Sequence, residues 1–181
     1  MTIPRIKHYV ENLYVDRYAI TSPTEIDIEA IAFDRSATVL EGKLTGCEAM
    51  IIGAGDKATI TVNEQSSPQR QRFSIGHELG HSLFGHSELT HLGHGEMDYQ
   101  STRSLREMEI SADRIGYLCA NSLEDSVTAM MKIASGLDNE FLNQDIRPFL
   151  DQSVSLANQL DNGKYNNTTH PPLPLRARSL I

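Results

Sequence analysis

Cysteine is scarce in this chain, and its scarcity limits what can hold the fold together. The 181 residues include two cysteines, Cys47 and Cys119, which lie far apart and form no Cys-x-x-Cys pattern. A scaffold built on disulfides is therefore excluded, and we expect both thiols to be buried as small apolar groups in a reducing compartment. This usage predicts a cytoplasmic protein whose core is built from hydrophobic residues, which make up 39% of the chain.

Long apolar runs and an excess of basic residues are also missing. No stretch reaches the roughly 18 consecutive apolar residues that a transmembrane helix needs, so we expect no membrane span. The first residues contain no apolar segment of the kind found in signal peptides. The formal net charge is −8 and the pI about 5.3. These values argue against direct binding to nucleic acid and favour a neutral or basic protein partner.

The apolar pattern predicts an α+β fold in a single domain over residues 1–181. Apolar residues at helical spacing predict a helix within residues 3–20 and a short helix around residues 26–33. A small twisted sheet should follow, with three strands at about 37–43, 47–53 and 58–63. A Gly/Asp turn predicts that the last two strands form a hairpin. The sheet is compatible with a meander that supports the next helix and with an edge strand on which an extended peptide can dock, and the two do not exclude each other.

We divide the predicted domain into three parts. The N-terminal helices and sheet occupy residues 1–66, a mostly helical part occupies residues 67–160, and a proline-rich segment occupies residues 161–181. The helical part should contain a helix that begins at Ser67, a second at about 103–120, and two more within 122–160, one of them kinked by Pro148. The prolines near the end of the chain are compatible with a polyproline II tail.

The residues most suggestive of chemistry lie in the run His77-Glu78-Leu79-Gly80-His81. Residues four apart on a helix share a face, so His77 and His81 can direct two imidazole nitrogens at one metal ion. Glu78 would lie beside that ion, where it could take a proton from a water activated by the metal. The alternative is a surface helix that carries two histidines by chance. The motif favours the active-site helix of a zinc peptidase.

A catalytic zinc ion usually has three protein ligands and one open position, so a third ligand is needed. Glu109 and Asp113 are again four residues apart and share a helix face. We assign Glu109 to the metal and expect Asp113 to accept a hydrogen bond from the second ring nitrogen of one histidine. Glu107 is the rival ligand, although the residue four positions later is Ser111. A solvated acidic helix face is the alternative interpretation of this segment.

Two families resemble different parts of the chain. Residues 24–86, above all Asn63-Glu64 and the later RQRFSIGHELGH, resemble the ImmA/IrrE-like metallopeptidases, in which a small sheet precedes an HExxH helix. That resemblance implies cleavage of helix-turn-helix transcriptional repressors. The motifs HELGHSLFGH, EISADRIGYL and HPPLPLR are more similar to the HtpX-like CAAX-protease family. In that family the glutamate of ExxAD is the third zinc ligand and the late His-Pro element lies near the active site, but its members usually carry transmembrane helices.

Both resemblances are of the gluzincin type and imply a zincin-like domain that binds Zn²⁺ through His77, His81 and Glu109. The expected function is a zinc-dependent endopeptidase that cleaves a regulatory protein, such as a helix-turn-helix repressor, at one site. Two alternatives stay open. One is a soluble HtpX-like protease of other cytosolic proteins, and the other is a zinc-containing regulatory module that acts by binding.

The HtpX-like resemblance also makes His170 a second candidate catalytic residue beside Glu78. A tetrahedral intermediate needs a donor in addition to the metal, and Pro171 and Pro172 restrict the position of His170. Tyr165 is a nearby alternative donor. The competing interpretation is a C-terminal tail with an exposed histidine.

Overall fold

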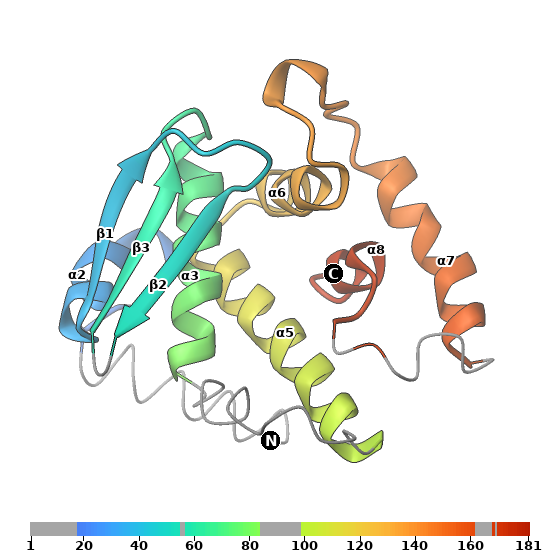
Figure 1. The fold of residues 1–181 in the computed structure, drawn as a ribbon, viewed down its shortest axis with the longest axis horizontal. Coiled ribbons are helices and arrows are strands. Elements are labelled where there is room, and N and C mark those ends of the chain that lie inside the picture. Colours follow the sequence, from blue (N-terminus) through green and yellow to red (C-terminus); the bar gives the residue numbers. More distant parts are fainter. Residues whose placement is uncertain (1–17, 55–56, 84–98, 162–167, 169) are drawn as a thin grey trace.

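The computed structural model describes residues 18–54, 57–83, 99–161, 168 and 170–181, and this part of the chain has the predicted α+β fold with a small three-stranded sheet (Figure 1). The helix predicted within residues 3–20 lies largely outside the described residues. The elements in chain order are η2 (Pro23–Glu25), α2 (Ile28–Asp34), β1 (Ala37–Gly42), β2 (Ala49–Ala54), β3 (Lys57–Asn63), α3 (Pro68–Leu83), α5 (Tyr99–Ala120), α6 (Leu123–Ser135), η3 (Asn139–Phe141), α7 (Arg147–Asp161) and α8 (Leu173–Arg178).

The sheet has the strand order β1-β3-β2, with β3 in the centre. The three predicted strands and the β2–β3 hairpin are confirmed, with bounds that differ by one or two residues. The meander interpretation is wrong because β1 pairs in parallel with β3 rather than with β2. The side-chain amide of Asn63 donates to the carbonyls of Leu44 (2.8 Å) and Cys47 (3.2 Å), which holds the connecting loop across the end of the central strand. As a result β2 is an edge strand.

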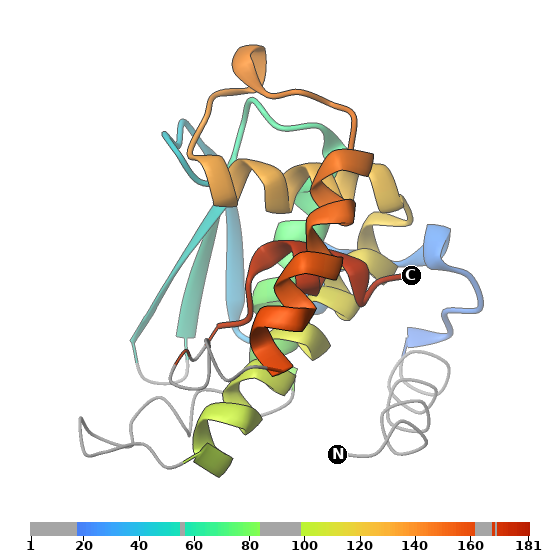
Figure 2. The same cartoon turned by 90° about the vertical axis from the view of Figure 1, so that its right-hand side faces the viewer.

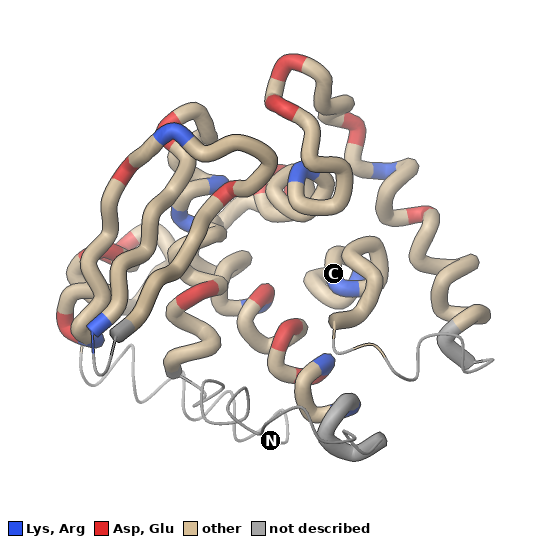
Figure 3. Tube along the Cα trace, in the orientation of Figure 1, with Lys and Arg blue, Asp and Glu red and all other residues tan. Residues whose placement is uncertain are grey.

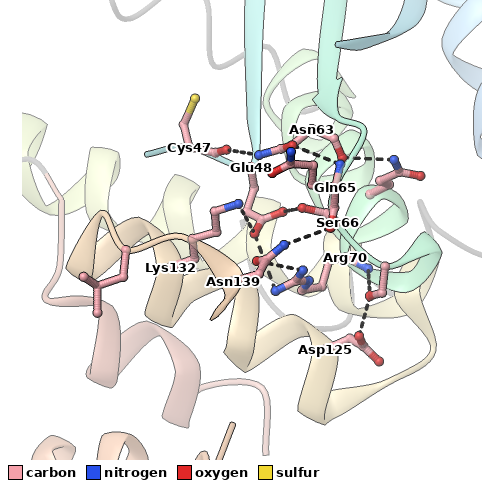
Figure 4. Close-up of polar contacts among 12 residues, drawn as sticks. Cys47, Glu48, Asn63, Gln65, Ser66, Arg70, Asp125, Lys132 and Asn139 are labelled. Carbon is pink, nitrogen blue, oxygen red and sulfur yellow. Dashed lines mark hydrogen bonds and ion pairs between the residues drawn. The ribbon is translucent and has the colours of Figure 1, made fainter. Parts of the chain in front are cut away.

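A buried polar cluster joins the start of this edge strand to α6 (Figure 4). Glu48 and Lys132 are each 1% exposed, and Nζ of Lys132 lies 3.4 Å from Oε1 of Glu48. Ser66 donates to the same carboxylate, and Arg70 of α3 lies 3.8 Å from it. Buried charges are costly unless they are paired. The cluster therefore fixes the position of β2 relative to α3 and α6.

Helices α3 and α5 pack unusually closely because glycine occupies their contact (Figure 1). A Cβ atom on Gly76 would lie 3.0 Å from the Cα of Gly116, and one on Gly80 would lie 2.8 Å from the Cα of Ala112. A Cβ on Gly116 would lie 2.7 Å from the carbonyl oxygen of Phe73. Only residues without a side chain permit this approach of two backbones. The close contact brings the face of α3 that carries the HExxH motif against α5.

Replacing Gly116 by alanine should therefore destabilise the protein. In an exposed helix the same change would stabilise by roughly 1 kcal/mol. Here the new methyl group would press on backbone, and overpacking of this kind costs about 1–3 kcal/mol. Urea denaturation of the metal-free protein measures the free energy of unfolding, and Ala134→Gly on the exposed face of α6 calibrates the helix propensity term. A Gly116→Ala variant as stable as the wild type would contradict this account of the contact.

The helical C-terminal half is confirmed, with one correction at Pro148. This proline lies in the first turn of α7, so it begins the helix instead of kinking it. The first turn suits proline because its backbone nitrogens have no partner within the helix. Phe141 and Val154 are apolar but 67% and 70% exposed. Phe141 belongs to the short η3 turn, where helical periodicity does not determine the buried face.

The polyproline tail interpretation is wrong. Residues Leu173–Arg178 form helix α8, in which Pro174, Arg176 and Ala177 are buried. Leu173 and Ala177 join a core cluster with residues of α3, α6 and α7. Figures 1 and 2 show α8 beside α7, with α5 and α6 on its other side. The C-terminal segment is therefore an integral part of the fold, and it approaches α5.

Both cysteines are free, and their environments differ. Cys119 is fully buried as expected, and burial raises the pKa of its thiol to about 12 although Arg72 opposes the shift. Cys47 is partly exposed, so the expectation of two buried thiols is wrong for this residue. Within the described residues, no helix combines the length and the apolar character needed to cross a bilayer.

Candidate metal centre

His77, His81 and Glu109 come together at the contact of α3 and α5. Their possible ligand atoms all lie within 4.8 Å of one another. The two Nε2 atoms of His77 and His81 are 3.2 Å apart, and Nε2 of His81 is 3.6 Å from Oε1 of Glu109. Ligands about 2.0–2.1 Å from a tetrahedral zinc ion lie about 3.3 Å from each other. The donor types and the two distances from His81 fit a divalent metal ion such as zinc.

The predicted neighbour of the histidines, Asp113, lies behind His77. Its Oδ1 atom is 2.9 Å from Nδ1 of His77, and the carboxylate is fully buried. The two atoms are at hydrogen-bond distance, although the ring N–H is poorly aligned with the oxygen. A carboxylate in this position selects the tautomer that leaves Nε2 available to a metal.

Arg176 is a site residue that sequence reasoning missed. Its guanidinium donates from Nε and Nη2 to the two oxygens of Asp113, at 2.7 Å each, and Nη1 lies 2.8 Å from Oε2 of Glu109. Burial alone would raise the pKa of Asp113, but hydrogen bonds from Arg176 and His77 outweigh it and lower the pKa. Burial likewise opposes ionisation of Glu109, but interactions with His170, Arg176, His81 and His77 lower its pKa to about 2. Both carboxylates are therefore held ionised.

Glu78 faces the same site from α3. Desolvation raises the pKa of its carboxyl, the neighbouring Glu109 adds to that effect, and His77 opposes it. A carboxylate with a raised pKa is a stronger proton acceptor than an exposed one. Glu78 thus lines the pocket beside His77 with a carboxyl group whose pKa is raised.

The rival ligand Glu107 points away from the site. It is exposed and pairs with Arg103 one turn earlier on α5, at 3.0 Å. The structure thus brings Glu109, and not Glu107, to the histidines.

His170 lies beside the site, just before α8. Its Nε2 atom is 3.3 Å from Oε1 of Glu109, while most of the side chain is exposed. The hydrogen bond to Glu109 raises the pKa of His170, burial opposing the shift. Tyr165, the alternative donor, lies outside the described residues.

A pocket of about 210 Å³ opens beside His77 and Glu78. Its wall is mostly apolar and comes from the start of β2 and from α3, α5, α6 and α8. The lining residues are Cys47, Glu48, Ala49, Phe73, Ser74, His77, Glu78, Asp113, Met130, Ile133, Leu173 and Arg176. The pocket therefore connects the edge strand to the residues that could perform chemistry.

An α+β fold in which an HExxH helix faces a glutamate on the next helix is the architecture of zincin-like metallopeptidases. Residues 20–123, more than half of the chain, match the IrrE N-terminal-like domain of peptidase family M78, and the chain belongs to this family. Neither the curated proteins nor the solved structures gave a significant match. The match ends before His170 and Arg176, so the HtpX-like resemblance of the C-terminal motif stays a prediction.

Proposed function

We propose that the chain is a zinc-dependent endopeptidase with its active centre at His77, Glu78, His81 and Glu109. The observation that carries the proposal is the grouping of two imidazoles and one carboxylate at zinc-ligand separations, with a desolvated glutamate next to them. A structural zinc site normally has four protein ligands and needs no adjacent base. Among the residues that the structure describes, the donor set has three members, the number of protein ligands typical of a catalytic zinc site.

Each side chain has a role that follows from its surroundings. A bound zinc ion would supply Lewis acidity, which polarises a carbonyl and lowers the pKa of a water to about 7. Glu78 would accept the proton of the attacking water and return it to the nitrogen of the leaving peptide. Asp113 would keep His77 in one tautomer and orientation. His170, at the rim of the site, is our candidate donor to the developing oxyanion.

The surroundings of the site favour an extended peptide as substrate. Among the described residues β2 is paired on one side, so its outer edge can accept a further strand by main-chain hydrogen bonds, and Ala49 at its start lines the pocket. One substrate side chain next to the scissile bond would then enter the pocket. Since Phe73, Ile133 and Leu173 form part of its wall, we propose that this side chain is apolar.

Ile133→Asp should weaken binding of such a substrate with little effect on stability. Ile133 is 49% exposed, so the change removes part of the apolar wall and leaves the core intact. Burying an apolar side chain contributes roughly 1.5–3 kcal/mol, so we expect KM to rise about tenfold or more. Val154→Asp on α7, also exposed and not part of the pocket wall, is the control. An equal effect of the two changes on KM would argue against this pocket as the binding site.

For the substrate itself we propose a helix-turn-helix repressor. The net charge of −8 suits a partner with a basic surface, which DNA-binding proteins carry. The free cysteines are compatible with the reducing cytoplasm in which such a repressor acts.

Incubation of the zinc-loaded chain with a repressor encoded beside it, and separately with unfolded casein, tests the substrate class. We expect the repressor to yield two fragments from one bond, seen by intact mass, while casein stays whole. Extensive degradation of casein would favour the general HtpX-like protease. A stable complex with uncut repressor would favour the regulatory module that acts by binding.

A further inference from the structure

Helix α8 places a buried arginine against the acidic side of the metal centre. Arg176 is 7% exposed, although a guanidinium keeps its charge at every accessible pH. A buried charge of this kind requires acceptors for its five N–H groups. Figure 3 shows acidic positions along α5 opposite α8, which carries basic ones. The arginine therefore connects two segments of the chain through charge.

The contacts of Arg176 divide between the two carboxylates of the centre. Nε and Nη2 occupy both oxygens of Asp113 in a bidentate pair, each at 2.7 Å. Nη1 lies 2.8 Å from Oε2 of Glu109. The planar guanidinium fixes the direction of both contacts at once, which the point charge of a lysine cannot do.

These contacts determine which oxygen of Glu109 is directed at the histidines. With Oε2 held by Arg176, Oε1 faces His81 at 3.6 Å and His170 at 3.3 Å. Oδ1 of Asp113 is shared between Nη2 of Arg176 and Nδ1 of His77. One guanidinium thus orients one ligand directly and a second ligand through Asp113.

We propose that Arg176 is a positioning residue of the metal centre. The three ligands lie within the matched family domain, and α8 supplies the arginine that orients them. The inference rests on the metal centre proposed above. It goes beyond that proposal because the segment that supplies Arg176 lies outside the matched residues 20–123. A purely structural ion pair would hold α8 in place without affecting the ligand geometry, and this difference can be measured.

Arg176→Gln removes the positive charge and the planar guanidinium that contacts both carboxylates. It tests the proposal without any substrate. We expect the metal-free variant to fold, as judged by far-UV circular dichroism, and its zinc affinity to fall about 10- to 100-fold in competition with a chromogenic chelator. Its cobalt(II) complex should show shifted visible bands. Arg178→Gln, an exposed position two residues later on α8, should match the wild type in both readouts. A folded Arg176→Gln with wild-type zinc affinity and cobalt spectrum would overturn the proposal.

Arg176→Lys decides the case in which the glutamine variant fails to fold. Lysine keeps the charge but cannot hold both carboxylates in fixed directions. We expect a folded protein with weakened zinc affinity and an altered cobalt spectrum. Wild-type values, or loss of the fold in this variant too, would assign Arg176 a structural role alone. Absence of peptide cleavage would leave these results unchanged, whereas a wild-type chain that binds no zinc would remove the metal centre and this inference together.

Discussion

Glu78→Gln should abolish peptide hydrolysis while the protein keeps its fold and its zinc. The amide has the size and shape of the carboxylate but cannot accept the proton of an attacking water. Glu78 is the one site carboxylate whose pKa is raised, through desolvation first and the nearby Glu109 second. Removing a general base costs about 10²–10⁴ in rate. We expect kcat/KM to fall by a factor in this range, measured on a fluorogenic peptide that spans the cleavage site.

The control for this variant is Glu107→Gln. Glu107 is exposed, pairs with Arg103 and lies on α5 away from the histidines. Its replacement by glutamine should therefore leave kcat/KM unchanged. Zinc content of the Glu78 variant must equal that of the wild type for the comparison to hold. Full repressor inactivation by Glu78→Gln would show that the chain acts by binding, and the peptidase proposal would then be wrong.

The second large effect is expected at the third ligand. Within the described part of the chain, Glu109 is the carboxylate that is grouped with both histidines. In Glu109→Ala, zinc bound to the purified chain should therefore fall from about one per chain to a small fraction. The loss of affinity should exceed the roughly 10- to 100-fold typical of residues behind the ligands. Metal analysis by mass spectrometry together with chelator competition measures both quantities.

Glu107→Ala is the matched control for Glu109→Ala, since the two residues are neighbours on α5. Its partner Arg103 is itself exposed, and surface pairs of this kind contribute little. We expect zinc content and affinity of the Glu107 variant to equal those of the wild type. Equal zinc content in the Glu109 variant would remove Glu109 from the ligand set and would reopen the assignment of Glu107.

The motif helix and its partner could be predicted because their signals are local. Ser67 and Pro68 mark the start of α3, as the structure confirms. A spacing of four residues places His77 and His81 on one helix face. The same spacing predicts that Glu109 and Asp113 share a face of the next helix. The three strands could also be predicted, from their β-branched residues and from the turn between the last two.

The strand order and the role of α8 depend on contacts between distant segments. The parallel pairing of β1 with β3 requires the loop between β1 and β2 to cross the end of β3. Asn63, the last residue of β3, holds this loop through its hydrogen bond to Leu44. The prolines near the C-terminus indicated an extended tail, yet Leu173, Ala177 and Leu180 recur at helical spacing and pack into the core. That periodicity was a usable signal for α8. Arg176 lies on the same buried face as these residues, and its charge there is explained only by the carboxylates that it meets on α5.

Titration of activity with zinc tests the central claim most directly. The chain is first freed of metal with a chelator and the chelator is removed. Zinc is then added in fractions of an equivalent while the cleavage rate of the repressor is followed. The account predicts no cleavage without metal and a rate that rises linearly to a plateau at about one zinc per chain. A cleavage rate that is the same with and without zinc, or no cleavage by the fully loaded chain, would contradict it.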